Sequence, residues 1–164
     1  MKIFFVVLIL ILLFFLITNT FGFFTGAPYA PTPSKKIKEL IKILKLNKND
    51  VVVDLGSGDG RLLIDVYYTK SKAIGYELNP FLYLLSKYRT RKLKGVEVCF
   101  SDFWRADLKS ATVIFVFILP QFMKRLEKKI STEVKPGTRV VTYLVSLPNH
   151  KPIQQILGFN IYKF

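Results

Sequence analysis

Three glycines alternate with small or acidic residues in DLGSGDG, the stretch from Asp54 to Gly60 that directly follows an apolar run. Glycine has no Cβ, so a turn that contains Gly56, Gly58 and Gly60 can bring its backbone N–H groups close to a ligand. In open α/β sheets, the first turn between a strand and a helix is a usual place for such a ligand. The stretch therefore predicts a ligand-binding loop, and a tight turn without a ligand is the alternative.

The spacing of these glycines argues against two common phosphate-binding loops. The dinucleotide pattern G-x-G-x-x-G requires a third glycine where this chain has Arg61, and the lysine of a P-loop is absent. The acids at Asp54 and Asp59 instead favour a ligand with a cationic amino acid part, such as S-adenosylmethionine. The loop residues expected to bind this cofactor are Asp54, Gly56, Ser57, Gly58, Asp59 and Gly60.

Strand and helix patterns alternate on both sides of this loop. Near-continuous apolar runs predict strands at 51–55, 73–77, 96–100, 112–119 and 139–145. Helices are expected between them, at about 61–68, 80–92 and 121–130. Apolar runs of this kind are typical of parallel strands covered on both faces. The alternation predicts an α/β fold with a doubly wound, mostly parallel sheet, and a last strand at 159–164 is expected to add antiparallel at its edge.

An uncharged apolar segment, residues 3–17, begins the chain and continues to residue 24. About 22 residues of helix span roughly 33 Å, which is enough to cross a hydrocarbon core of roughly 30 Å. We predict an uncleaved transmembrane anchor over 1–24. A cleaved signal peptide is the alternative, although the single basic residue Lys2 is a poor start for one. The positive-inside tendency places the globular part in the cytoplasm, because three basic residues follow the segment closely, Lys35, Lys36 and Lys38.

The rest of the chain is predicted to hold a Pro-rich linker over 25–33 and one domain over 34–164. The domain is expected to open with a helix capped by Ser34, whose apolar face is Ile37, Leu40, Ile41 and Leu44. The net charge of +14 favours an anionic surface, either lipid headgroups or nucleic acid. A lone Cys99 excludes an internal disulfide, and with a single His150 it argues against a zinc site, so no metal is expected.

DLGSGDG matches D/E-x-G-x-G-x-G at every fixed position, and on this motif the chain resembles the class I S-adenosylmethionine-dependent methyltransferases, which have a Rossmann-like fold. The resemblance implies that Glu77, in GYELNP, accepts hydrogen bonds from the ribose hydroxyls of the cofactor. It also implies that Asp102, in SDFW, accepts from the adenine amino group, with Phe103 or Trp104 against the ring. A solvated aspartate without a ligand is the alternative for Asp102.

Further segments, PYAPTP, LPQFM and KPGTRVV, resemble a narrower group, the single-span lysine methyltransferases related to the enzyme that methylates the c subunit of ATP synthase. In that group Tyr29 and Thr32 would fold over the cofactor as a flap, whereas a rigid spacer is the alternative. The residues implied to orient the target amine are Leu119, Pro120, Gln121 and Phe122. Pro120 is alternatively a simple helix-starting proline. The tail after Leu147 departs from the group, and we expect one edge strand to be missing.

The leading expectation is a membrane-anchored, S-adenosylmethionine-dependent protein-lysine methyltransferase that acts on a membrane protein or a membrane-associated partner. Anchoring would raise the local concentration of such substrates. A methyltransferase for a lipid or another small molecule is one alternative. The basic helices leave RNA as a less favoured substrate, and a non-catalytic cofactor-binding module is the alternative outside the enzymes.

Overall fold

The computed structural model describes residues 2–10, 12–13 and 30–164, and the first two of these segments are helical. The anchor predicted over 1–24 lies largely outside the described residues, as do Tyr29 and most of the linker. Within the described ranges, none of the helices combines the length and the apolar character needed to cross a bilayer.

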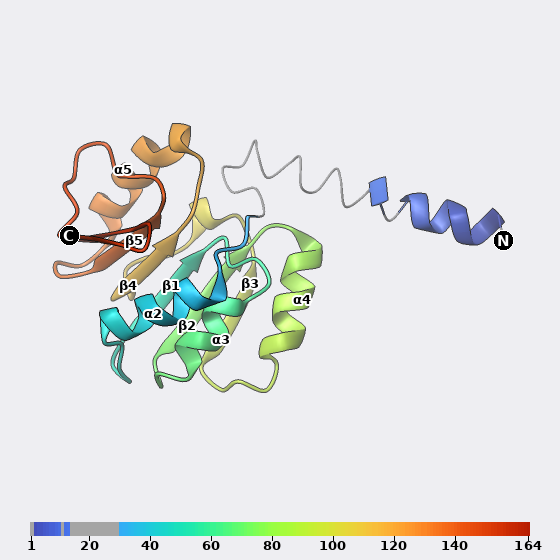
Figure 1. The fold of residues 1–164 in the computed structure, drawn as a ribbon, viewed down its shortest axis with the longest axis horizontal. Coiled ribbons are helices and arrows are strands. Elements are labelled where there is room, and N and C mark those ends of the chain that lie inside the picture. Colours follow the sequence, from blue (N-terminus) through green and yellow to red (C-terminus); the bar gives the residue numbers. More distant parts are fainter. Residues whose placement is uncertain (1, 11, 14–29) are drawn as a thin grey trace.

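A seven-stranded sheet forms the centre of the domain, in the order β3-β2-β1-β4-β5-β7-β6 (Figure 1). The first five strands in the chain are parallel, and β7 runs antiparallel to both β5 and β6. This sheet confirms the predicted mostly parallel α/β fold. The strands are β1 Val51–Leu55, β2 Lys72–Glu77, β3 Val96–Phe100, β4 Val113–Val116, β5 Arg139–Tyr143, β6 Gln154–Ile156 and β7 Phe159–Lys163.

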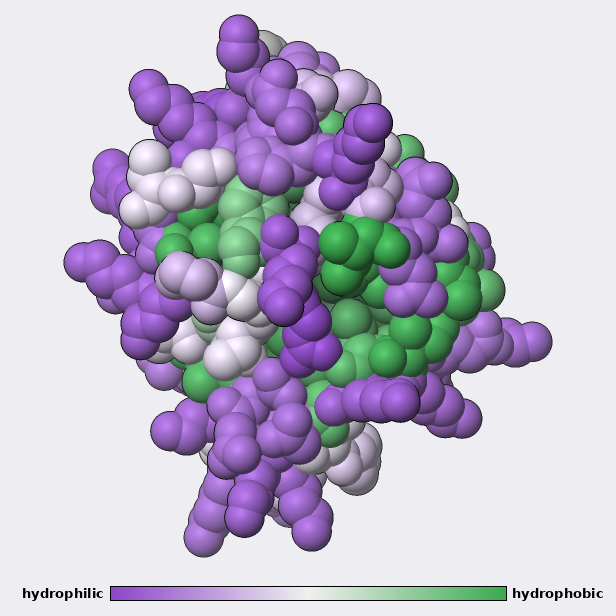
Figure 2. Space-filling view, turned by 90° about the vertical axis from the view of Figure 1, so that its left-hand side faces the viewer, coloured by the Kyte–Doolittle hydropathy of each residue, from purple (hydrophilic) through white to green (hydrophobic). Residues whose placement is uncertain are grey.

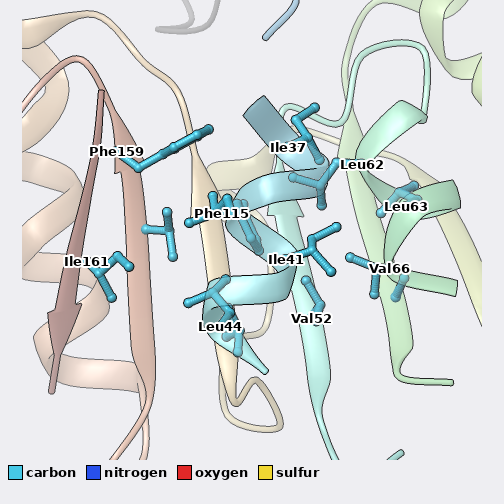
Figure 3. Packing of buried hydrophobic residues seen from close by; sticks show 14 of the residues in the cluster. Ile37, Ile41, Leu44, Val52, Leu62, Leu63, Val66, Phe115, Phe159 and Ile161 are labelled. Carbon is cyan, nitrogen blue, oxygen red and sulfur yellow. The ribbon is translucent and has the colours of Figure 1, made fainter. Parts of the chain in front are cut away.

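Helices cover both faces of the sheet and create two cores. Helices α2, α3 and α4 lie on one face, where the side chains of α2 point toward Val52 and Phe115 of the strands (Figure 3). Helix α5 covers the other face, against Val53 and Ile114. Adjacent residues of one strand thus enter opposite cores, which explains the continuous apolar runs. The helices are α2 Ser34–Leu44, α3 Arg61–Tyr67, α4 Pro80–Thr90 and α5 Met123–Glu133, with short 3-10 helices η1 Phe103–Arg105 and η2 Pro120–Phe122.

Several element boundaries differ from the sequence-based expectation. Pro33, not Ser34, takes the N-cap position of α2, and no side chain caps that helix. Strand β4 stops at Val116, before the proline-containing segment begins. Strand β5 stops at Tyr143 because Leu144 has a φ of 62°, which extended strands do not allow.

The expectation that the tail lacks an edge strand is wrong. The tail forms the hairpin β6–β7, and β6 rather than β7 is the outermost strand at this end. Its two-residue turn has positive φ at both positions, 56° at Leu157 and 88° at Gly158, as in the turns that match the twist of a hairpin. Leucine is an unusual residue at the first position, so the turn was not recognisable from the residue types.

Helix α5 is tied to the segment before β6 by a buried carboxylate. Glu127 accepts hydrogen bonds from the backbone N–H of Asn149 at 3.0 Å, from its side-chain amide at 2.7 Å, and pairs with Nδ1 of His150 at 2.6 Å. Burial acts to raise the pKa of Glu127, but the contacts from His150 and Asn149 outweigh it and lower that pKa. The ionised carboxylate is therefore the form that holds this connection.

We expect Glu127→Gln to lower the free energy of unfolding by about 1–3 kcal/mol, because a buried charged acceptor is lost. Urea unfolding at pH 7 measures this change. Glu133→Gln is the matched control on the same helix, since Glu133 pairs with Lys129 in a partly exposed i,i+4 contact at 2.8 Å. That control should cost less than about 0.5 kcal/mol. Equal losses in the two variants would contradict a special role for the Glu127 connection.

Candidate active site

The glycine loop leaves the carboxyl end of β1 and is fastened to β2. The backbone N–H groups of Gly56 and Ser57 both donate to the carbonyl oxygen of Tyr76, at 3.0 Å each. Gly56, Gly58 and Gly60 have φ values of 95°, 55° and 78°, a region that disfavours side chains. The loop backbone thus requires glycine at these three positions. Because glycine has no side chain, the loop exposes mainly backbone groups to a ligand.

Glu77 is the last residue of β2, and its carboxylate accepts a hydrogen bond from the backbone of the glycine loop. Its Oε2 accepts from the N–H of Gly58 and its Oε1 from the N–H of Asn79, each at 2.7 Å. Burial raises the pKa of Glu77, against the opposing effect of these backbone donors. Each carboxylate oxygen has a second lone pair. Glu77 can therefore accept two further hydrogen bonds from a vicinal diol such as a ribose.

Asp54 lies in β1 immediately before the loop and is buried. Burial first, and then the charges of Glu77 and Asp59, raise the pKa of Asp54 to about 7. A buried group of carboxylates is stabilised in its ionised form by a nearby positive charge. The site is thus suited to a ligand with a cationic end, in agreement with the sequence-based expectation.

Asp59 is engaged by two arginines rather than left free. Its carboxylate contacts Arg61 at 2.9 Å and Arg89 at 2.6 Å. Burial acts to raise the pKa of Asp59, but the hydrogen bonds and charge of Arg61, with the charge of Arg89, lower it overall. Arg61 also donates to the carbonyl oxygen of Thr32 at 3.3 Å. Asp59 therefore fixes the loop to α4 and to the residues before α2, while its predicted contact with the cofactor stays a prediction.

The flap over the cofactor stays a prediction. The bond between Thr32 and Arg61 brings the residues before α2 beside the glycine loop, as a flap over this site requires. Tyr29 lies outside the described residues.

Asp102 follows β3 and is the N-cap residue of η1. Its Oδ1 accepts from the N–H of Trp104 at 3.0 Å. Phe103 is 5% exposed and packs into the core beside α5, so its ring contributes mainly to that core. Trp104 is half-buried, and the guanidinium of Arg125 lies 4.0 Å from its ring centroid. Of the two aromatic candidates for an adenine contact, Trp104 is the more accessible.

The segment predicted to orient an amine follows β4 at the same edge of the sheet. The carbonyl oxygen of Leu119 accepts from the N–H of Phe122 at 3.0 Å and keeps one lone pair. Pro120 is the first residue of η2, so the interpretation as a helix-starting proline also fits. Pro120 and Gln121 are exposed, and the Phe122 ring centroid lies 6.3 Å from that of Trp104.

Gly75 is a site residue that the sequence reasoning missed. A Cβ at Gly75 would lie 2.6 Å from Cδ1 of Leu63 and 2.7 Å from Cβ of Ser57, so the loop rests directly on β2. The Oγ of Ser57 is buried and finds no hydrogen-bond partner among the residues that the structure describes. A glycine inside an otherwise apolar strand was the signal, because it often marks such a close approach.

We expect Gly75→Ala to displace the loop at Ser57, weaken cofactor binding and destabilise the fold by about 1–3 kcal/mol, the usual cost of overpacking. Isothermal titration with S-adenosylhomocysteine and urea unfolding measure the two effects. Adding Ser57→Gly should restore part of both, because it removes one of the two colliding side chains. A Gly75→Ala variant with unchanged cofactor affinity would show that the loop does not depend on this contact.

The glycine loop leaves the end of β1, Glu77 is the last residue of β2, and Asp102 follows β3, so all three lie at the carboxyl edge of one sheet. This is the arrangement of a class I S-adenosylmethionine-dependent methyltransferase domain. The chain belongs to the ANTKMT methyltransferase domain family, whose profile matches residues 54–154. That match begins at the first residue of the glycine motif.

Individual relatives agree with this family. The chain is 36% identical over 129 residues to a lysine N-methyltransferase of Xenopus laevis that is named for the c subunit of ATP synthase, covering 76% of this chain and 56% of that protein. It is 33% identical over 134 residues to a protein-lysine N-methyltransferase of Saccharolobus islandicus, covering 79% and 83%. The chain thus spans little more than half the length of the frog relative and most of the archaeal one.

Solved structures share the fold. An RNA methyltransferase from Salinibacter ruber, crystallised with S-adenosyl-L-homocysteine, superposes with a TM-score of 0.75 at 26% identity and covers 82% of this chain and 92% of that one. A methyltransferase from Thiobacillus denitrificans with the same ligand gives a TM-score of 0.60 at 20% identity, covering 74% and 54%.

Proposed function

We propose that this chain is an S-adenosylmethionine-dependent protein-lysine N-methyltransferase. The observation that carries the proposal is the match to the archaeal protein-lysine N-methyltransferase, because it extends over most of both chains. The geometry supports a cofactor of this kind. A backbone-lined loop, a diol acceptor at Glu77 and the buried acid Asp54 fit a nucleoside that carries a cationic amino acid.

Each residue of the site has a role in this reaction. S-adenosylmethionine supplies a methyl group on a sulfonium, so a neutral lysine nitrogen forms the new N–C bond while the S–C electron pair returns to sulfur. Glu77 would hold the ribose, Asp54 the ammonium and Asp102 the adenine amino group. The free lone pair of the Leu119 carbonyl and the Gln121 amide would align the amine, whose proton is lost to water. Alignment and exclusion of water are then the main catalytic contributions of the chain.

The substrate is proposed to be a membrane protein or a membrane-associated protein. The uncharged apolar run over residues 3–17 supports an anchor, and the lysines that follow it support a cytoplasmic domain. The net charge of +14 suits contact with anionic headgroups. Alkaline carbonate extraction of the full chain from cells tests anchoring, and protease accessibility in sealed vesicles tests orientation. Release into the carbonate supernatant would reject the anchor.

The activity is tested by incubating the full chain in detergent with tritiated S-adenosylmethionine and membranes from its own source. We expect a labelled protein band that a Glu77→Ala variant does not produce. Acid hydrolysis of the band should release methylated lysine. Absence of any labelled band, with S-adenosylhomocysteine shown to bind, would reject protein methylation in those membranes.

RNA methylation is the second candidate, supported by the structural similarity to the Salinibacter ruber enzyme at 26% identity. Exposed basic residues on α4 and α5 could contact phosphates, among them Lys87, Lys124, Arg125 and Lys128. RNA from the same source, added to the labelling reaction, distinguishes the two functions, because tritium would then become sensitive to ribonuclease. A lipid acceptor would place the tritium in the organic extract instead.

A further inference from the structure

A lysine ammonium of the chain itself lies against an aromatic cluster at the carboxyl edge of the sheet. The Nζ of Lys36 donates to the hydroxyl of Tyr143 at 3.2 Å and lies 5.4 Å from the centroid of the same ring. Phe117 meets Tyr143 edge to face at 5.5 Å between centroids, and Phe159 packs on it at 4.8 Å. We call Phe117, Tyr143 and Phe159 the aromatic cluster.

The position of the cluster connects it with the methyl-transfer edge. Tyr143 is the last residue of β5, and Phe117 follows the last residue of β4. These strands are parallel neighbours, so their ends meet at the edge that also carries the glycine loop. Lys36 lies in the first turn of α2, one turn after Thr32, whose carbonyl is bonded to Arg61. The Lys36 ammonium therefore lies at this edge of the sheet, against the last residue of β5.

The contacts of Lys36 are of the kind that an acceptor lysine needs. Within the described part of the chain, no carboxylate lies within ion-pair distance of its Nζ. A carboxylate would hold a proton on an amine, whereas aromatic rings attract the ammonium only moderately, roughly 0.5–2 kcal/mol. An aromatic site without an acid can thus hold a lysine side chain and still allow it to become the neutral nucleophile.

A hollow at the C-terminal hairpin reaches one member of the cluster, Phe159. Leu144, Gly158 and Phe159 line this hollow, and the Tyr143 ring lies against Gly158. Leu144, which lines it, is 63% exposed. The side of the molecule that carries β5 and α5 shows apolar surface between hydrophilic side chains (Figure 2). Apolar residues that flank an acceptor lysine could pack there.

We propose that the aromatic cluster is the binding site for the acceptor lysine, and that Lys36 occupies it until the substrate arrives. The assignment rests on the proposed lysine methylation, for which it supplies the acceptor subsite. Tyr143 provides the aromatic ring and the hydroxyl that contact the lysine. Phe117 and Phe159 pack against that ring and hold it in position. The site becomes available when Lys36 is displaced.

Direct binding is tested by NMR with [13Cε]lysine in the full chain. The Lys36 signal should differ from those of the solvent-exposed lysines, and Tyr143→Leu should abolish this difference. Millimolar n-butylammonium, a mimic of the lysine side chain, should move this signal back toward the free position, and n-butanol should not. Lys36→Met should bind n-butylammonium more tightly, because the internal competitor is removed. A Lys36 signal that n-butylammonium leaves unchanged at saturating concentration would overturn the proposal.

Activity provides the second test and separates the acceptor site from the proposed function. Tyr143→Leu should lower the initial rate of protein labelling about tenfold while affinity for S-adenosylhomocysteine stays the same. Tyr143→Phe should retain most of the rate, because the ring remains. If the wild type labels protein and Tyr143→Leu does so at the same rate, the acceptor site is overturned but the methyltransferase activity is not. Displacement of Lys36 by n-butylammonium without any protein labelling would show that the cluster binds alkylammonium groups, but it would reject lysine methylation and with it the acceptor role of the cluster.

Discussion

Affinity for S-adenosylhomocysteine should fall roughly 50-fold between pH 7 and pH 5, because Asp54 gains a proton in this range. The pKa of Asp54 is raised to about 7 in the ligand-free protein, chiefly by burial. A protonated Asp54 does not attract the ammonium of the ligand, so affinity follows the ionised fraction of this carboxyl. The amino group of the ligand itself titrates above this range. Isothermal titration at several pH values, in buffers with different ionisation enthalpies, measures both the affinity and the proton released on binding.

Asp54→Asn is the control for this pH dependence, and it should change binding and stability in opposite directions. The variant should bind weakly and with little dependence on pH. In the unfolded chain this carboxyl loses its proton near the ordinary aspartate pKa of 3.8, whereas the folded one keeps it up to about 7. Stability of the ligand-free wild type therefore falls as the pH rises through this window, and Asp54→Asn, which has no such carboxyl, should be more stable above pH 7, by up to about 4 kcal/mol. A variant that binds as tightly as wild type, or that is less stable at pH 8, would contradict this role for Asp54.

The parts of the site that could be predicted from the sequence are those encoded by local patterns. The boundaries of β1 and β3 coincide with the expected ones, because apolar runs bounded by turn residues define them without reference to the rest of the chain. The glycine loop is recognisable for the same reason. Glu77 was assignable because the family resemblance implies an acid at the end of the second strand, and parallel strands bring their ends to one edge.

The parts that could not be predicted depend on contacts between distant residues. Asp59 has the residue type of a ligand-binding acid, yet Arg89, thirty positions away, occupies it. Lys36 resembles the other lysines on the solvent side of α2, and only the arrival of Tyr143 gives it a partner. The final hairpin depends on the positive φ of Leu157, which its residue type does not indicate. Residue patterns identify the elements, whereas packing determines which side chains remain available.

Replacement of Glu77 by glutamine should reduce cofactor affinity roughly 100-fold or more, since two hydrogen bonds to a charged acceptor, each about 1.5–3 kcal/mol, depend on this carboxylate. The cause lies in the two backbone donors. Gly58 and Asn79 each point an N–H at one carboxylate oxygen at 2.7 Å. In glutamine one of these oxygens becomes an NH2 group, so two donors face each other and the loop must move. Titration calorimetry with S-adenosylhomocysteine gives the affinity, and urea unfolding gives the cost in stability.

Glu97→Gln is a matched control for Glu77→Gln, because Glu97 is an exposed carboxylate on the neighbouring strand β3. It should leave cofactor affinity and protein labelling unchanged. Glu77→Asp should keep the negative charge, but its shorter side chain cannot reach both backbone N–H groups. The cofactor affinity of this variant should therefore lie between those of wild type and Glu77→Gln. If Glu77→Gln instead bound the cofactor as tightly as Glu97→Gln, Glu77 would serve only to shape the loop, and the ribose would have to be held by other residues.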